Sequence, residues 1–124
     1  MNRSGEAPLI GIVDDDEAIR DSISSLVRSV GFRAMVFPSA EGFLGSTWMH
    51  DSDCLILDVR MPGLSGLELQ SRLAGMEVPI PVIFATAHHD DDVRKRALDQ
   101  GAVAFLRKPF TDEALFKAMC SALA

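Results

Sequence analysis

Short runs of apolar residues recur along the chain, and each run is bounded by turn residues or charged residues. Runs of this length, rich in β-branched and aromatic side chains, are typical of strands that are buried on both faces. We expect five strands, over residues 9–13, 33–37, 54–58, 82–85 and 102–106. The third run ends on Asp58 and precedes a Pro62-Gly63 turn, so it places one carboxylate at the carboxyl end of a strand.

Between these runs, apolar residues recur three and four positions apart, which predicts amphipathic helices. The expected helices run from Glu17 to Val30, Ser39 to Leu44, Ser65 to Ala74, Asp90 to Gln100 and Thr111 to Leu123. Ser39, Ser65 and Thr111 are expected to cap their helices, because a hydroxyl oxygen can accept a hydrogen bond from the first turn. Strands that alternate with helices predict βαβ units, and therefore a doubly wound parallel sheet with helices on both faces.

The composition indicates one globular domain over residues 1–124, with 48% hydrophobic and 24% charged residues. The net charge of -6 opposes binding of phosphate backbones, so any nucleic acid would be contacted by another domain or partner. Cys54 and Cys120 show no metal or redox spacing, and we expect both to be buried thiols in a reducing cytoplasm. No apolar run reaches membrane-spanning length, and no signal peptide pattern is present. Trp48 is expected to cover part of the core from its edge.

The predicted topology brings polar residues from four strand ends to one edge of the sheet. Asp14 and Asp15 follow the first strand, Asp58 ends the third, Thr86 follows the fourth and Lys108 follows the fifth. Carboxylates this close repel each other unless a cation compensates them, and magnesium fits because it prefers oxygen ligands. An ammonium and a hydroxyl can bond the oxygens of a phosphoryl group. We therefore expect a magnesium site at which Asp58 is the nucleophile of a phosphoryl transfer.

Several separate motifs follow each other in a recognisable order. They are Val13-Asp14-Asp15, the apolar strand ending on Asp58 with Met61-Pro62-Gly63 and Gly66 after it, Ala85-Thr86-Ala87 and Lys108-Pro109-Phe110. Together they resemble the receiver domain of bacterial two-component response regulators, and the resemblance spans the whole chain. The details are most similar to receivers that are joined to a LuxR-type helix-turn-helix output domain in nitrogen-fixation regulators.

The resemblance implies a flavodoxin-like fold, with a five-stranded parallel sheet of strand order 2-1-3-4-5 and five helices. It implies that Asp58 accepts a phosphoryl group from the phosphohistidine of a sensor histidine kinase or a histidine phosphotransfer protein. Magnesium would be bound by the side chains of Asp15 and Asp58 and by the backbone carbonyl of Arg60. Asp14 would act on the ion partly through water.

The resemblance also implies a switch. Lys108 would pair with the phosphoryl group, and its peptide bond to Pro109 would be cis. Thr86 would move toward the phosphoryl oxygens, and Phe105 would turn inward behind it. The output face would consist of the fourth helix, the fifth strand and the fifth helix, over residues 90–122. This face would act on an output domain or a downstream protein, with a phosphorylation-dependent homodimer as one form of the response, in the regulation of transcription.

Each of these residues also has an ordinary structural explanation. Asp58 could form a turn, the acids at 14–17 could favour a helix N-terminus, and Phe105 could be a core residue. The acids at 14–17 could both bind a metal ion and stabilise the N-terminus of the helix that follows them. His88 and His89 lack a third ligand at a useful spacing, and we expect a solvated loop there instead of a metal site.

Three other functions fit parts of the pattern. A phosphohydrolase commonly carries a second carboxylate two residues after its nucleophile, where this chain has Arg60. A flavodoxin-like nucleotide-binding protein needs a phosphate loop after its first strand, and the acids at 14–17 would repel a phosphate there. An interaction module without phosphorylation would not need the intact set of acids. We therefore expect a signalling switch that is not a turnover enzyme.

Overall fold

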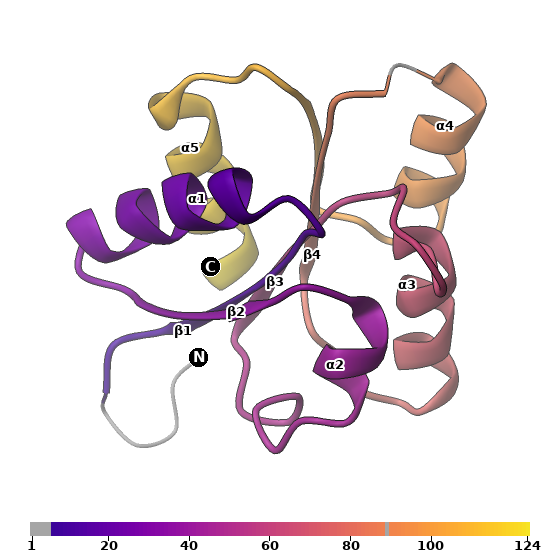
Figure 1. The fold of residues 1–124 in the computed structure, drawn as a ribbon, viewed down its shortest axis with the longest axis horizontal. Helices are drawn as coiled ribbons and strands as arrows, with labels where there is room; N and C mark the ends of the chain where they lie inside the picture. The colour runs from indigo at the N-terminus through magenta and orange to yellow at the C-terminus, as the bar shows by residue number, and fades with distance from the viewer. Residues whose placement is uncertain (1–5, 89) are drawn as a thin grey trace.

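The computed structural model of the protein describes residues 6–88 and 90–124, and its strands form one sheet. The strands are β1 (Leu9–Val13), β2 (Arg33–Phe37), β3 (Cys54–Leu57), β4 (Val82–Thr86) and β5 (Ala104–Arg107). Neighbouring strands are parallel throughout, in the order β2-β1-β3-β4-β5 (Figure 1). The parallel sheet that the residue pattern predicted and the strand order that the resemblance implied are both confirmed.

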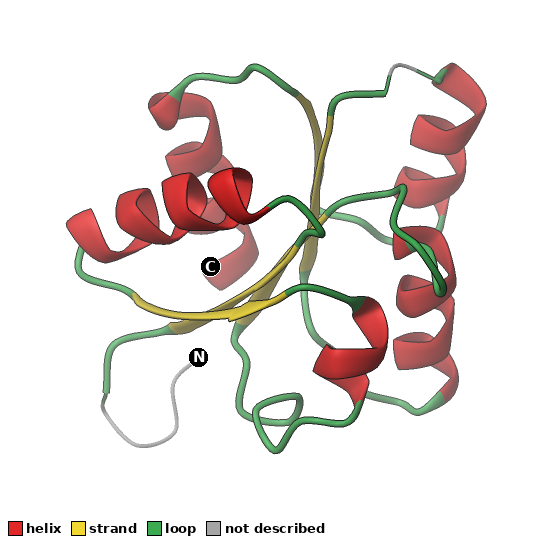
Figure 2. Cartoon of the chain, viewed as in Figure 1, coloured by secondary structure: helices red, strands yellow, loops and turns green. Residues whose placement is uncertain are grey.

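Five helices alternate with the strands among the described residues (Figure 2). They are α1 (Glu17–Ser29), α2 (Ala40–Leu44), α3 (Gly66–Gly75), α4 (Asp91–Asp99) and α5 (Asp112–Leu123). The three predicted hydroxyl caps are confirmed, because Ser39, Ser65 and Thr111 each accept a backbone N–H from the first turn of their helix. Ser65 also forms a capping box with Glu68, which fixes the start of α3 directly after the loop that follows β3.

The strands contribute to two apolar cores, one on each face of the sheet. On β3, Leu55 and Leu57 pack into the core beneath α2, α3 and α4, whereas Cys54 and Ile56 face the core beneath α1 and α5. Figure 1 shows these two sets of helices on opposite sides of the sheet. Because both faces are covered, the central strands consist almost entirely of apolar residues and show no alternation of polar positions.

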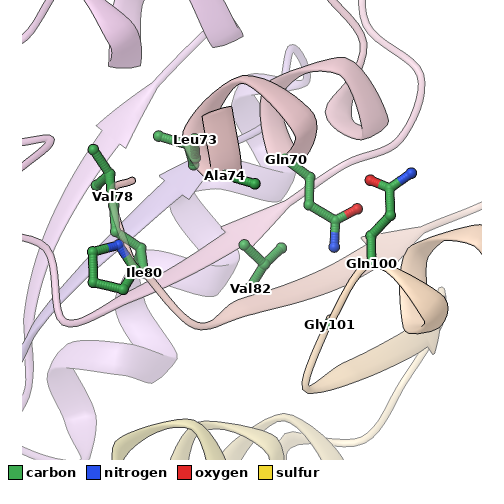
Figure 3. A pocket seen from close by; sticks show the side chains of 9 residues that line it. Gln70, Leu73, Ala74, Val78, Ile80, Val82, Gln100 and Gly101 are labelled. Atoms are coloured by element: carbon green, nitrogen blue, oxygen red, sulfur yellow. The ribbon is translucent and has the colours of Figure 1, made fainter. Parts of the chain in front are cut away.

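A buried glutamine links two helices at the amino end of the sheet. The Gln70 amide nitrogen donates to the carbonyl of Ala97 at 3.1 Å, so it ties α3 to α4. Its oxygen Oε1 is buried and has no hydrogen-bond partner among the described residues. A small pocket is lined by this amide, by Gln100 and by apolar residues such as Leu73 and Val82 (Figure 3). The pocket lies at the amino end of β4, whereas the predicted acid cluster lies at the carboxyl end of the sheet.

Trp48 leaves 38% of its surface exposed, and the adjacent Met49, at 5%, joins the core; the role of Trp48 at the edge of the core stays a prediction. The prediction of a buried thiol at Cys120 is wrong. Cys120 is exposed, because the buried side of α5 is formed by Leu115 and Met119, and the next residue after Met119 is rotated about 100° around the helix axis. Cys54 is buried as predicted, and burial raises the pKa of its thiol to about 12. Among the residues that the structure covers, no helix has the length and apolar character needed to cross a membrane.

Candidate functional site

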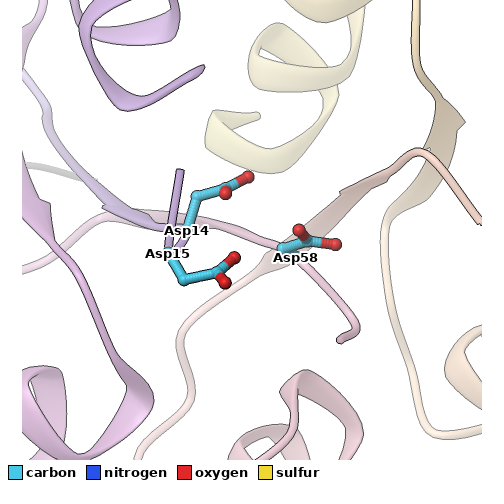
Figure 4. Close-up of side chains that lie close together, drawn as sticks. All are labelled: Asp14, Asp15 and Asp58. Carbon is cyan, nitrogen blue, oxygen red and sulfur yellow. The ribbon is translucent and has the colours of Figure 1, made fainter. Parts of the chain in front are cut away.

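Three carboxylates converge at the carboxyl end of the sheet. Asp14 and Asp15 follow β1, and Asp58 follows β3, its hydrogen-bonded neighbour. The register pairs Val13 with Leu57, so the residues that follow these two strands emerge side by side. One oxygen from each carboxylate lies within 4.8 Å of the others (Figure 4). The convergence that the sequence predicted for these acids is therefore present.

Backbone groups hold two of the three acids in place. The carboxylate of Asp58 accepts the N–H of Val59 at 2.7 Å, and that of Asp14 accepts the N–H of Asp16 at 3.0 Å. The Arg20 guanidinium donates to the backbone carbonyl of Asp14 at 2.8 Å, which ties the start of α1 to the end of β1. Asp14 and Asp58 are 3% and 9% exposed, whereas Asp15 is open to solvent. The cluster thus has two fixed acids and one that solvent reaches freely.

Lys108 supplies the positive charge of the cluster. Its ammonium lies 2.7 Å from Asp14 Oδ2 and 3.6 Å from Asp58 Oδ2. Its backbone N–H donates to the carbonyl of Thr86 at 2.8 Å, and its peptide bond to Pro109 is cis, as expected. In this structure the ammonium makes its shorter ion pair with Asp14, and the predicted phosphoryl acceptor is its more distant neighbour.

The pKa of Asp58 is raised above the usual value of an aspartate. Burial is the largest cause, and the charge of Asp14 adds to it. The Lys108 ammonium, a hydrogen bond from the Thr86 hydroxyl and the Val59 N–H oppose the rise. Because the negative charge of the Asp58 carboxylate is only partly balanced by these neighbours, the site favours the approach of further positive charge.

The donor set fits a magnesium ion. All three side chains offer hard carboxylate oxygens, and magnesium binds one or two such carboxylates while it keeps several waters. The exposed Asp15 leaves one side of the cluster open to solvent. Arg60, whose backbone carbonyl is the fourth predicted ligand, lies in the loop directly after Asp58, and its side chain is exposed.

The loop between β3 and α3 is closely fitted around Asp58. The Gly66 N–H donates to the carbonyl of Val59 at 2.8 Å, and a Cβ at Gly66 would overlap the backbone carbonyl oxygen of Asp58. Two residues before Gly66, the Leu64 N–H donates to Glu41 Oε2 at 3.0 Å. The structural role of Glu41 has no local sequence signal, since 23 residues separate it from its partner. In the sequence, a glycine directly after the predicted helix cap Ser65 was the available signal that the Gly66 backbone lies close to another part of the chain.

The two predicted switch residues lie on neighbouring strands. Thr86 is fully buried at the end of β4, and its hydroxyl oxygen accepts the N–H of His88 at 3.2 Å. Phe105 on β5 is half-buried and packs on Phe84, with ring centroids 5.9 Å apart. The structure thus places Thr86 beside Asp58, and Phe105 one strand farther out. The side chain of His88 is exposed, in keeping with the expected solvated loop, while His89 lies outside the described residues.

Known proteins resemble this chain along nearly its whole length. A family model described as the response regulator receiver domain matches residues 10–120. Nodulation protein W of Bradyrhizobium diazoefficiens is 46% identical over 114 residues, which are 92% of this chain and 50% of that protein. The transcriptional regulatory protein FixJ of the same organism is 40% identical over 114 residues, 92% of this chain and 56% of that protein. The chain therefore spans about half the length of these curated relatives.

Solved structures show the same arrangement of elements. The crystal structure of FixJ-N has a TM-score of 0.85 at 35% identity, and the match covers 95% of this chain and 94% of that one. A response regulator receiver protein from Burkholderia phymatum has a TM-score of 0.80 at 46% identity, with 94% of each chain covered. The family-model match over residues 10–120 includes the acid cluster and Lys108.

Proposed function

Since the chain belongs to the response regulator receiver domain family, we propose that its Asp58 accepts a phosphoryl group from the phosphohistidine of a sensor histidine kinase or a histidine phosphotransfer protein. A carboxylate oxygen of Asp58 forms a bond to phosphorus as the bond between phosphorus and the imidazole nitrogen breaks. The imidazole, protonated on its other ring nitrogen, leaves with the electron pair of that bond and so returns to its neutral form. The product is an aspartyl phosphate on this chain.

The surrounding residues have separate roles in this proposal. Asp15, Asp58 and the Arg60 carbonyl would hold magnesium, with Asp14 reaching it partly through water, and the ion when bound supplies positive charge beside the phosphoryl oxygens. Lys108 moves its ammonium from Asp14 toward the new phosphoryl oxygens, a short step given its present position between Asp14 and Asp58. The Val59 N–H orients the Asp58 carboxylate.

One observation carries the proposal: three carboxylates and one ammonium meet at the carboxyl end of parallel strands. The direct test is incubation of the chain with acetyl phosphate and Mg²⁺, followed by intact mass measurement. We expect the mass to rise by a single phosphoryl group, which hydroxylamine removes as it does from acyl phosphates. Chelation of the metal before the donor is added should prevent the increase. A chain that gains no mass with donor and metal present contradicts the proposal.

Substitution of the ammonium tests the role of Lys108. In Lys108→Met, no cation faces the oxygens that gain charge during transfer, and we expect the rate of labelling by acetyl phosphate to fall roughly a hundredfold. The rate is measured by intact mass at saturating Mg²⁺, with Lys117→Met on α5 as the control, because that ammonium is exposed and pairs only weakly with Glu113 at 4.0 Å. An unchanged rate in Lys108→Met would exclude the lysine from the reaction.

We propose that phosphorylation is reported through Thr86 and Phe105. Thr86 ends the strand next to β3 and its hydroxyl opposes the rise in the pKa of Asp58, so it can follow an added phosphoryl oxygen and vacate space behind it. The half-buried ring of Phe105 would turn into that space. The consequence would appear on the face formed by α4, β5 and α5, and Phe116 of α5 and Val103, just before β5, leave 39% and 37% of their surface exposed. Apolar residues at this exposure suit a face that binds a second copy of the chain, an output domain or a downstream protein.

The family is one of signalling receivers, and we propose that this chain is a switch that does not turn over a substrate. The position two residues after Asp58 holds Arg60 and no second carboxylate that could act as a general acid. Its relatives include a transcriptional regulatory protein, so we infer an output in transcription, carried by a domain or partner outside these residues. A cytoplasmic location remains a prediction.

A groove beside the acid cluster suits the kinase or phosphotransfer partner. It is lined by Ile19, Ser22 and Leu26 of α1 and by Phe110 before α5, and Lys108 lies at its edge. The groove is mostly apolar and reaches the acid cluster through Lys108. A helix that carries a phosphohistidine could rest there with the imidazole directed at Asp58. We propose this groove as the docking site for that helix.

Ser22 offers a way to block the groove without disturbing the core, because its side chain is exposed. With Ser22→Arg, we expect phosphoryl transfer from a purified histidine kinase that phosphorylates the chain to slow roughly tenfold. Labelling by acetyl phosphate should keep its rate, since the small donor does not use the groove. Ser25→Arg is the matched control, on the same helix and exposed but away from the groove. Equal slowing by both substitutions would argue against this docking site.

A further inference from the structure

Glu41 connects the short helix α2 to the loop that follows Asp58. Its carboxylate oxygen Oε2 accepts the backbone N–H of Leu64 at 3.0 Å, across 23 residues of sequence. The acceptor is a charged carboxylate, which strengthens a hydrogen bond from a backbone N–H, although this bond is exposed to solvent. The contact therefore joins two segments that no strand pairing holds together.

The geometry at Gly63 shows independently how closely the loop fits Glu41. Gly63 has φ +78°, and a Cβ built on it would overlap Glu41 Oε2 and lie 3.2 Å from the carboxyl carbon. Any side chain at position 63 would displace the carboxylate or the loop. The left-handed backbone favours glycine here, and a side chain at this position would push the Glu41 carboxylate away from the loop.

Glu41 belongs to a short helix, α2, that is capped and packed into the core. Ser39 caps α2 by accepting the N–H of Gly42 at 3.0 Å, and Ala40 and Phe43 are fully buried. The Phe43 ring packs edge-on against Phe37 of β2, with centroids 5.2 Å apart. Because the helix is anchored on both sides of Glu41, its carboxylate can fix the loop without moving with it.

The loop has few other attachments between Arg60 and Ser65. Met61 is buried, whereas Arg60, Pro62 and Gly63 are exposed. Met61 packs into the core and Leu64 packs against it, while the other hydrogen-bonded anchors lie at Val59 and at the capping box of α3. The bond to Glu41 adds a polar restraint after the exposed residues Pro62 and Gly63, on the segment that leads from the acid cluster to α3.

We propose that Glu41 is a positioning residue of the phosphoryl-acceptor site. It holds the loop over residues 59–64 in the conformation that presents the Arg60 carbonyl and the Asp58 carboxylate to magnesium. The inference rests on the proposed function for the reaction it serves, while the restraint on the loop is independent of that reaction. Loss of the carboxylate should loosen the loop and weaken metal binding without changing the charges of the acid cluster itself.

Amide hydrogen exchange followed by NMR tests the restraint without any phosphodonor. In Glu41→Ala, we expect the Leu64 amide to exchange about tenfold faster, as loss of a bond to a charged group implies. Glu41→Gln should stay close to the parent chain, because its amide oxygen can accept the same N–H. Asp21→Ala is the matched control, which removes one exposed negative charge from α1 and contacts no part of the loop. Unchanged exchange in Glu41→Ala overturns the inference.

The Mg²⁺ concentration that gives half-maximal labelling by acetyl phosphate tests the functional part. We expect it to rise several-fold in Glu41→Ala and to recover in Glu41→Gln, an effect that general destabilisation would not restore. If the parent chain takes up no phosphate at all, the proposed function fails, yet Leu64 exchange still decides the restraint. If labelling is normal and neither variant shifts the Mg²⁺ dependence, the positioning role is wrong.

A double variant checks that Gly63 and Glu41 act on each other. Gly63→Ala alone should accelerate Leu64 exchange, because the new methyl group displaces the carboxylate. In the Glu41→Ala background the same substitution should add much less, since the group it would strike is already absent. Strictly additive effects on exchange would show that the two residues do not share one contact.

Discussion

Gly66→Ala is expected to destabilise the protein by about 3 kcal/mol, at the upper end of the range for overpacking in a buried site. The new Cβ would overlap the backbone carbonyl oxygen of Asp58 and lie 3.1 Å from the Phe84 ring. A backbone atom cannot rotate away as a flexible side chain can, so the loop or the start of α3 must shift. Thermal and urea denaturation followed by circular dichroism would measure the loss, on the order of 10 °C in the midpoint temperature.

Gly75 provides the matched control at the other end of the same helix. A Cβ there meets no atom within 4 Å. Gly75→Ala should therefore stabilise the chain, by roughly 0.5–1 kcal/mol, because alanine lowers the entropy cost of the helix. Helix propensity alone would predict the same sign for both substitutions. Equal stabilisation by both would contradict the close approach at Gly66.

Asp58→Asn is expected to raise the free energy of unfolding at neutral pH in metal-free buffer. Burial, and then Asp14, raises the pKa of Asp58 in the folded protein, so the folded state binds the proton more tightly than the unfolded state. The stability that this proton contributes is fully present below the usual aspartate pKa of about 4 and is lost as the pH rises through the higher folded value. Asparagine lacks this titration, so the advantage of the variant should appear as the pH rises and vanish in acid.

Denaturation of both chains across the acid range, with a chelator present, measures the difference. Lys108 keeps its ion pair with Asp14 in the variant, so no buried ammonium is left without a partner. Asp21→Asn, on the exposed side of α1, should change stability by less than about 0.5 kcal/mol at any pH. A variant that is less stable than the parent at neutral pH, or whose advantage grows in acid, would contradict the raised pKa.

The sheet could be predicted because its strands are buried on both faces. Such strands appear in the sequence as unbroken apolar runs, and β1 and β2 match the predicted residues 9–13 and 33–37. The fifth strand begins at Ala104, two residues later than predicted, because the Ala102 N–H bonds back to the carbonyl of Ala97 and closes α4. An apolar residue in a helix-closing turn and one in a strand look alike when only the pattern is known.

The acid cluster could be predicted from topology, since parallel strands deliver the residues after them to one edge. The side-chain contacts within and around the cluster could not be predicted in this way. Lys108 lies closer to Asp14 than to Asp58, which depends on differences of about an ångström between rotamers. The contact of Glu41 with Leu64 joins segments whose relative position is determined by the packed fold. Cys120 illustrates the same limit, because one residue of rotation along α5 separates a buried site from an exposed one.

The most direct test of the account is the location of the phosphoryl group after reaction with acetyl phosphate and Mg²⁺. The parent chain, Asp58→Asn and the control Asp21→Asn are labelled in parallel, and the aspartyl phosphate is located by borohydride reduction and peptide mass spectrometry. We expect labelling of the parent and the control at Asp58 alone, and none of Asp58→Asn although it remains folded by circular dichroism. Undiminished labelling of folded Asp58→Asn, or a label at another residue of the parent chain, would contradict the assignment of Asp58 as the phosphoryl acceptor.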